Sequence, residues 1–397
     1  MIESHDSIEG SGLPLGFCFD RHGQRPGIFD GQVGQATLRV DARAMGAHQK
    51  EALVHESGNG LAWRLVSDEG PYLKGSDMAP FPLGFFNAGL QADLLGQISR
   101  LVQLQGSRIS SVDLELDNVF SFSGSFYKGD GKGGAESAQL RFALKGDAPS
   151  DEVASLVKQA VLASPAMAAM TTPLDCTFAL YVNGIRRDVL QALPSVAYAR
   201  DPLKAYSRAP GPLADGGDRA GIITKVPQPP VKTEVMPAAG AKFDLRVMGQ
   251  SRLSDIARGL VDVQTWLKAP AGSHFGFQTD ELSLTGASAP SGLALLSAGV
   301  SFCYMTQLLR YAEYLKYKVR SIRMVQYNPF GVRQDALGAT VGMAAPADTH
   351  LFLNGDEPDE VMQRLLVMGA QTCYLHAALK TALAPVVQLT YNGQSLY

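Results

Sequence analysis

The sequence predicts an α+β protein made of two similar domains with antiparallel sheets. The expected order of strand, strand, helix, strands, helix and strand occurs twice, and it is not the alternation that gives parallel sheets. A local repeat agrees with this order: APFPLGFFNAGLQAD at 79–93 and APSGLALLSAGVSFC at 289–303 share five of fifteen positions at an offset of 210. Two shorter matches keep this offset to within a residue, namely GDAPSDE from Gly146 with GDEPDE from Gly355, and LYVNG from Leu180 with LTYNG from Leu389.

The first domain is expected over 36–190, after a Gly-rich and weakly patterned extension at 1–35. Alternating and β-branched residues predict its strands, and apolar residues at helical spacing predict its long helix. A capping-box-like start at Ser150 predicts a second helix. In order, the expected elements are strands at 36–45 and 60–69, a helix at 82–104, strands at 109–124 and 138–145, a helix at 150–163, and a strand at 176–184.

The second domain is expected over 241–397, after a Pro- and Gly-rich linker at 191–240. The proline-dense part of this linker, 197–240, is expected to hold no regular structure. The same patterns place the elements of the second domain. They are strands at 243–249, 259–267 and 274–281, a helix at 291–317, strands at 319–328, 338–345 and 349–353, a helix at 359–371, a short helical segment from 372, and a strand at 384–393.

Composition narrows the class of protein. The chain of 397 residues is long enough for two cores, and its net charge of −3 gives no reason to expect nucleic acid or an anionic membrane as a partner. The polar start shows no secretory signal, and four cysteines without a framework spacing favour a reducing compartment, so we expect a cytoplasmic protein. The apolar stretch 292–309 has the length of a membrane span, but its polar residues favour a buried core helix.

Two cysteines distinguish the second copy from the first. Cys303 aligns with Asp93, and Cys373 aligns with Ser164. Either cysteine alone would be read as a small buried hydrophobe, and Cys18 and Cys176 are interpreted in that way. Cys303 and Cys373 occur together in one copy only, and each lies near a helix start or a break between helices. Because a helix N-terminus lowers a thiol pKa, this placement indicates reactive thiols.

His376 follows Cys373 by three residues and shares its face if the segment is helical. It is a candidate to lower the thiol pKa or to act as general base, and the alternative is a partly buried structural histidine.

The string from Asp280, DEL followed by APSGLALLSAGVSFCYM, resembles the OsmC/Ohr family. That family carries an Asp-Glu-Pro-like strand end, a Pro-containing turn and a helix of the form Leu-Leu-x-Ala-Gly-x-x-x-Cys. Its second cysteine opens a later helix, and here the gap from Cys303 to Cys373 is 70 residues. The resemblance covers roughly 300 of the 397 residues, in both copies.

This resemblance implies a thiol peroxidase that reduces organic hydroperoxides. It implies that Cys303 attacks the peroxide and becomes a sulfenic acid, and that Cys373 condenses with it to a disulfide. It also implies a dithiol reductant, often of the lipoyl type, and neither a metal nor an organic cofactor. The family's intertwined α+β homodimer would form within this one chain as a pseudodimer, or two chains would associate, and Asp93 and Ser164 would mark a dead site.

The chain departs from the family at the residues that hold the thiolate, which are a glutamate before the cysteine and an arginine on an early strand. The stretch PSGLALL carries no carboxylate, and Arg258 or Arg252 would have to supply the arginine. Glu281 and Asp280 are further candidates for the site. Two other functions therefore stay open: a hydrolase, transferase or lyase with a cysteine nucleophile for an electrophilic small molecule, or a non-catalytic module that binds an apolar ligand.

Overall fold

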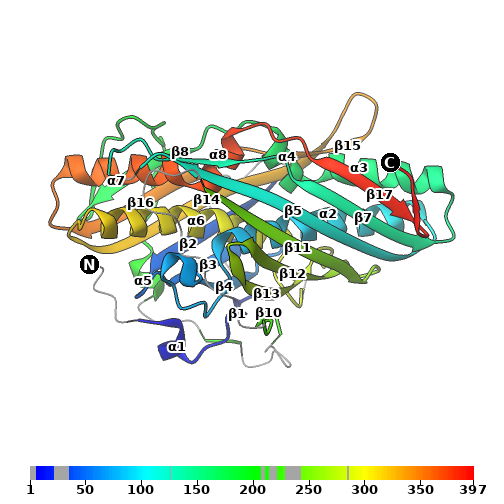
Figure 1. The fold of residues 1–397 in the computed structure, drawn as a ribbon, viewed down its shortest axis with the longest axis horizontal. Helices are drawn as coiled ribbons and strands as arrows, with labels where there is room; N and C mark the ends of the chain where they lie inside the picture. The colour runs from blue at the N-terminus through cyan, green and yellow to red at the C-terminus, as the bar shows by residue number, and fades with distance from the viewer. Residues whose placement is uncertain are drawn as a thin grey trace.

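The computed structural model describes residues 6–21, 35–125, 127–206, 211–213, 221–228, 243–283 and 286–397. Over these residues the chain is a mixed α+β protein with two sheets, and two long helices lie between the sheets. Helix α2 (Pro82–Gln105) packs on the second sheet, α6 (Gly292–Tyr314) packs on the first, and the two helices pack on each other. Figure 1 shows both helices running along the long axis of the molecule.

Within the described residues each sheet has nine strands and draws them from both halves of the sequence. The first sheet has the order β1 (Gly16–Asp20), β4 (Ala62–Ser67), β3 (Lys50–Glu56), β2 (Gln35–Ala44), β14 (Val319–Gln334), β16 (Asp348–Gly355), β8 (Thr177–Val182) and β9 (Ile185–Arg187), with β15 (Thr340–Ala344) on β14. The second sheet has the order β10 (Ile223–Lys225), β13 (Ala271–Asp280), β12 (Leu260–Ala269), β11 (Phe243–Asp255), β5 (Ile109–Ser123), β7 (Gln139–Gly146), β17 (Val386–Tyr391) and β18 (Gln394–Ser395), with β6 (Lys132–Ala135) on β5.

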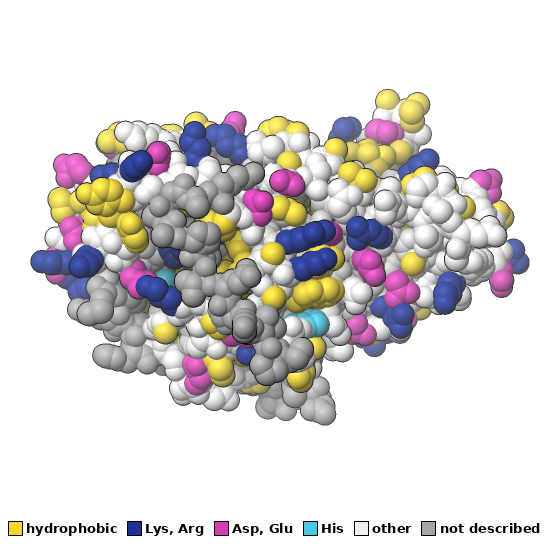
Figure 2. Space-filling model, in the orientation of Figure 1, with side chains coloured by type: hydrophobic (Ala, Val, Ile, Leu, Met, Phe, Trp, Pro, Cys, Tyr) yellow, Lys and Arg dark blue, Asp and Glu magenta, His cyan; other side chains and the backbone are white. Residues whose placement is uncertain are grey.

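The fold also contains shorter helices. They are α1 (Ile8–Ser11), the 3₁₀ turn η1 (Pro71–Leu73), α3 (Ser150–Ala163), α4 (Pro165–Thr171), α5 (Leu203–Tyr206), α7 (Asp359–Thr372) and α8 (Tyr374–Lys380). Of these, α3 packs on α2 and α7 packs on α6. One continuous core joins residues of both sheets, both long helices and α3, α4, α7 and α8. Helix α6 is long and apolar enough to cross a membrane, and 94% of its most apolar window is buried inside the fold, as in the core helix of a soluble protein. On the face in Figure 2, acidic and basic side chains are interspersed.

The structure corrects the expected elements in several places. The expected antiparallel sheets each contain one parallel pair, β8 with β16 and β7 with β17. These partners are far apart in the sequence, so no hairpin dictates their direction. The 197–240 stretch, expected to be irregular, contains α5 and β10, because β10 pairs with the edge of β13 despite its proline-rich surroundings. The extension at 1–35 contains α1 and β1, and the patterns missed α4, β3 and the short strands β6, β9 and β18.

Two glycines set the contact between the long helices. A Cβ at Gly89 would lie 2.4 Å from the Gly292 carbonyl oxygen and 2.5 Å from the Leu296 nitrogen. A Cβ at Gly299 would lie 2.7 Å from the Phe86 nitrogen and 3.0 Å from the Pro82 carbonyl oxygen. The corresponding pairs, 82 with 292, 86 with 296 and 89 with 299, all differ by 210 positions. The helices are therefore antiparallel, and each presents the same residues of its own repeat to the other.

Candidate functional site: a buried cysteine pair beside an ion pair

The fold brings Cys303 and Cys373 into contact. Cys303 lies in the middle of α6, and Cys373 is the N-cap of α8 at the break after α7. Both side chains are buried, and neither is in a disulfide. Their sulfur atoms are 3.3 Å apart, so a disulfide of about 2 Å needs an approach of little more than 1 Å.

The two thiols are not equivalent. Cys373 donates the hydrogen bond, and the sulfur of Cys303 accepts it. Burial, and then this bond, raise the pKa of Cys373 well above its usual value, although the backbone N–H groups of His376 and Leu375 act in the opposite direction. Cys373 is therefore a protonated thiol at neutral pH, and it is the donor in the contact with Cys303.

A buried ion pair lies one helical turn from Cys303. Lys50 of β3 donates to Glu69 Oε1 over 3.0 Å and to Thr306 Oγ1 over 2.9 Å, and Thr306 donates to the same carboxylate oxygen over 2.5 Å. Tyr72 of η1 donates to the other oxygen, Glu69 Oε2, over 3.0 Å. Thr306 follows Cys303 by three residues and so shares its helix face.

These groups enclose a very small cavity beside the thiol. Its lining includes Cys303, Thr306, Glu69, Tyr72 and Tyr374, and its volume of ≈ 10 Å³ is about the least that holds one water molecule. Sequence patterns missed Lys50 and Glu69, because both lie in the other half of the chain. The signal for Glu69 was present: SDEG at 67–70 matches TDEL at 279–282.

The structure places Glu281 at a different point from the one expected. Glu281 lies against Gly96 of α2 and accepts from the Gly292 backbone N–H over 2.8 Å. Burial, with a smaller effect of the Asp93 charge, raises the pKa of Glu281 to about 8. Strand β13 contacts α2, and Glu281, the residue after its end, lies near Asp93. Glu69, the residue that matches Glu281 in the other half, instead contacts Thr306 of α6 and lies near Cys303. Asp280 binds the loop that follows it, through Ser283 and Ser288.

The arginine candidates are also elsewhere. Arg258 lies in the turn between β11 and β12, where its half-exposed guanidinium is 3.7 Å from Asp280. Arg252 is exposed and bound to Asp113 on β5. Instead, the fold brings Lys50 to Thr306, one helical turn from Cys303, and Arg310 of α6 to Tyr374.

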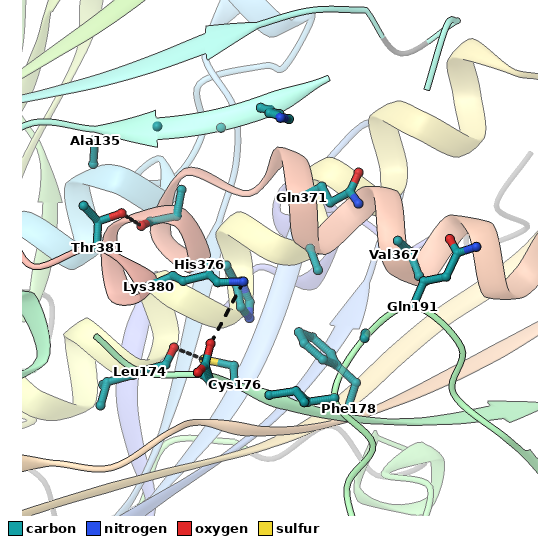
Figure 3. Close-up of a pocket in the computed structure, with 18 residues that line it drawn as sticks. Ala135, Leu174, Cys176, Phe178, Gln191, Val367, Gln371, His376, Lys380 and Thr381 are labelled. Carbon is teal, nitrogen blue, oxygen red and sulfur yellow. Dashed lines mark hydrogen bonds and ion pairs between the residues drawn. The ribbon is translucent and has the colours of Figure 1, made fainter. Parts of the chain in front are cut away.

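The ring of His376 lies in a pocket that neither Cys303 nor Cys373 lines. Its backbone N–H faces the Cys373 sulfur, but its ring packs against Tyr304 and Phe178 and lines a separate pocket of ≈ 890 Å³ (Figure 3). Burial lowers the pKa of His376 to about 4, and among the described residues its ring nitrogens have no partner. A neutral imidazole supplies no charge to lower a thiol pKa.

The remaining cysteines lie away from the pair. Cys176 lines the same pocket as His376, where burial raises the pKa of its thiol to about 11 (Figure 3). Cys18 is buried in β1. Within the described residues, no group of three or more His, Cys, Asp and Glu side chains could hold a metal ion.

The positions that align with Cys303, Cys373 and Lys50 hold different residue types in the other half of the chain. Ser164 and Asp93 occupy the aligned positions of the two cysteines, and Ser164 donates to Asp93 over 2.5 Å. Lys50 pairs with Ser67 between β3 and β4, as Val261 pairs with Thr279 between β12 and β13. Valine thus stands where the ammonium would be, and burial raises the pKa of Asp93 as well as that of Glu281.

Fold and site together define a mixed α+β protein with a buried dithiol next to a lysine–glutamate pair. No protein-family model matches the chain, and no curated protein matches it. The chain is similar to a solved structure of an OsmC-like hydroperoxide resistance protein from Jannaschia sp. CCS1, at 25% identity. That match covers 34% of this chain and 87% of the other, with a TM-score of 0.26, which does not establish a shared fold.

Proposed function

We propose that the protein is a thiol-dependent peroxidase that reduces organic hydroperoxides through Cys303 and Cys373. The observation that carries the proposal is the 3.3 Å contact between the two sulfur atoms, with Cys373 as donor and Cys303 as acceptor. Two residues 70 positions apart meet inside the core, in one copy of a repeat whose other copy has lost both.

We also propose that the chain is a tandem OsmC-like duplicate folded as a single-chain pseudodimer, with copies at 36–190 and 241–397 and a linker at 191–240. Matching strand orders in the two sheets and the reciprocal glycine contacts of α2 and α6 support this arrangement. The copies interlock, because β8 adds to the sheet that contains β16 and β17 adds to the sheet that contains β7. Each site is thereby completed by the other copy, as Lys50 and Glu69 complete that of Cys303.

The proposed reaction has three steps. The thiolate of Cys303 attacks the outer oxygen of the hydroperoxide, the O–O bond breaks, and the alkoxide takes a proton and leaves as an alcohol, so that Cys303 becomes a sulfenic acid. The Cys373 sulfur then bonds to the Cys303 sulfur, and the sulfenic oxygen leaves as water with the thiol proton. A dithiol of the lipoyl class reduces the disulfide and restores both thiols. Lys50 supplies positive charge near the developing anions, and Glu69 and Thr306 hold its ammonium in place.

Thiol counting tests the proposal. One equivalent of cumene hydroperoxide should consume two of the four thiols, and dihydrolipoamide should restore them. Cys303→Ser should lose turnover completely. Cys373→Ser should stop after one turnover with a sulfenic acid that a dimedone probe traps. Cys18→Ser and Cys176→Ser are the matched controls and should behave as the parent.

Other outcomes would favour the other functions. A cysteine nucleophile for an electrophilic carbon would be alkylated or acylated at Cys303 while Cys373 keeps its thiol. A module that only binds apolar ligands would keep all four thiols after peroxide. Parental turnover in Cys303→Ser would end the peroxidase proposal.

A further inference from the structure

Tyr72 stands between the buried cysteine cavity and a larger pocket at the surface. Its ring lines both spaces: the ≈ 10 Å³ cavity beside Cys303, and a pocket of ≈ 440 Å³ on the other side. Tyr72 is held by one short turn and by its hydroxyl bond to Glu69. The turn depends on glycine, since a Cβ at Gly75 would lie 1.9 Å from the Glu69 carbonyl oxygen.

Three segments that are distant in the sequence line the outer pocket. They are η1 together with Asp77, the stretch from Lys225 at the end of β10 to Gln228, and the first residues of β13, from Ala271 to His274. Strand β10 holds the second of these segments in place through its ladder with β13 and through the bond from the Val226 N–H to the His274 carbonyl. Pro71, Val226, Pro227 and Ala271 give the pocket much of its apolar surface.

The charged and polar groups of this pocket are already satisfied by one another. Lys225 is 2.8 Å from Asp77 Oδ2 and lies over the Phe275 ring, and Ser273 donates to Asp77 Oδ1 over 2.6 Å. His274 is bound by Gln264 and Gln228, and burial lowers its pKa, so the ring is neutral at pH 7. Among the described residues, those that line the pocket therefore offer no uncompensated positive charge to a carboxylate.

We propose that this outer pocket is the substrate entrance to Cys303, that Tyr72 is its gate, and that it admits compact, uncharged hydroperoxides over carboxylate-bearing ones. The size of the pocket suits a small organic molecule. Turning the Tyr72 side chain joins the pocket to the cavity and brings the peroxide to the thiol. The proposed substrate preference rests on the proposed peroxidase function. The proposed path from the outer pocket past Tyr72 to Cys303 does not depend on that function.

Alkylation of Cys303 by N-ethylmaleimide, located by mass spectrometry, measures the route without any peroxide. Tyr72→Ala should raise the Cys303 labelling rate at least tenfold, and Tyr72→Phe, which keeps the ring, should raise it less. Ala271→Trp should fill the outer pocket and slow labelling severalfold. Ala370→Trp, in the pocket of His376, is the matched control and should leave the rate unchanged. Circular dichroism and a thermal melt confirm folding of each variant. If Ala271→Trp and Tyr72→Ala both label at the parental rate, the entrance lies elsewhere.

Turnover then tests the substrate class. The parent should favour cumene hydroperoxide over linoleic acid hydroperoxide by at least tenfold in kcat/KM, and Tyr72→Ala should narrow that ratio. A preference for the carboxylate substrate would overturn the proposed selectivity. If the labelling results hold while neither peroxide is consumed, the route stands and the peroxidase function fails.

Discussion

Ser164 donates a hydrogen bond to Asp93 over 2.5 Å, and these residues stand where Cys373 and Cys303 stand in the other half of the chain. The contact survives although both residue types differ. Hydroxyl and carboxyl replace two thiols, and the neighbouring ammonium is replaced by Val261. The contact between the two positions is therefore a property of the fold, whereas the two thiols belong to one half.

This correspondence predicts that a second dithiol can be built. The double variant Asp93→Cys/Ser164→Cys should form an additional disulfide under mild oxidation by diamide, because the backbone already holds the two positions at contact. Free-thiol titration and peptide mapping would detect it. The single variant Asp93→Cys is the control and should keep its new thiol. Two stable, unpaired thiols in the double variant would show that the halves do not correspond here.

The raised pKa of Glu281 predicts that the protein loses stability at alkaline pH. The pKa of Glu281 is raised to about 8 in the folded protein, so the folded state keeps a proton that the unfolded state releases near pH 4.5. With respect to Glu281, the free energy of unfolding is therefore at its highest below pH 4.5. It falls by about 5 kcal/mol as the pH rises toward 8. Glu281→Gln should remove most of this dependence, as measured by denaturant unfolding at pH 5 and pH 8.

The exposed Glu136 supplies the control for that measurement. Glu136→Gln should leave the pH dependence of the parent unchanged. Equal pH dependence of unfolding in Glu281→Gln and the parent would show that Glu281 is ionised in the folded protein at neutral pH.

The ion pair at the cysteine site predicts a compensation experiment. Lys50→Met leaves the buried Glu69 carboxylate without its cation and should cost about 3–5 kcal/mol of unfolding free energy. Lys50→Met/Glu69→Gln should recover most of that loss, because no uncompensated charge remains. If Lys50 acts in the chemistry, the double variant should be stable yet slow with cumene hydroperoxide, in kcat/KM. Parental activity in the stable double variant would confine the pair to a structural role.

The lowered pKa of His376 predicts that the protein loses stability at acid pH. The pKa of His376 is about 4 in the folded protein and 6.5 in the unfolded chain. With respect to this residue, the free energy of unfolding is therefore highest above pH 6.5 and falls by about 3 kcal/mol as the pH approaches 4. His376→Phe keeps the ring packing on Phe178 and Tyr304 and should flatten this dependence in thermal melts. Because the ring lines a pocket that neither thiol lines, peroxide consumption should stay within twofold of the parent, and a tenfold fall would contradict a purely structural role.

The helix contact predicts a steric cost at Gly299. Gly299→Ala adds a methyl group 2.7 Å from the backbone of α2 and should destabilise the protein by about 2 kcal/mol, although alanine is the better helix former. Gly58→Ala, where nothing lies within 4 Å, is the matched control and should be near neutral. Denaturant unfolding of the two variants distinguishes close helix packing from a general effect of replacing glycine.

Local pattern predicted the elements that are long and periodic. The helix expected at 82–104 is α2 at Pro82–Gln105, and the helix expected at 150–163 is α3 with the same bounds. The pattern missed β3, whose residues are nearly all buried and therefore do not alternate. With β3 it missed Lys50, which on sequence alone is an ordinary charged residue and becomes part of the site only through its bond to Thr306, 256 positions away.

The sequence by itself predicted a repeat, the α+β order of elements and the candidates Cys303 and Cys373, because each of these predictions follows from local spacing and from the comparison of one half with the other. The tertiary structure decided which residues surround the thiols. Glu69 and Glu281 are equivalent in the sequence, and the crossing of α2 and α6 assigns Glu69 to the cysteines and Glu281 to Asp93. Helical and strand periods specify which face a residue occupies, but only the packing of the two halves specifies what that face meets.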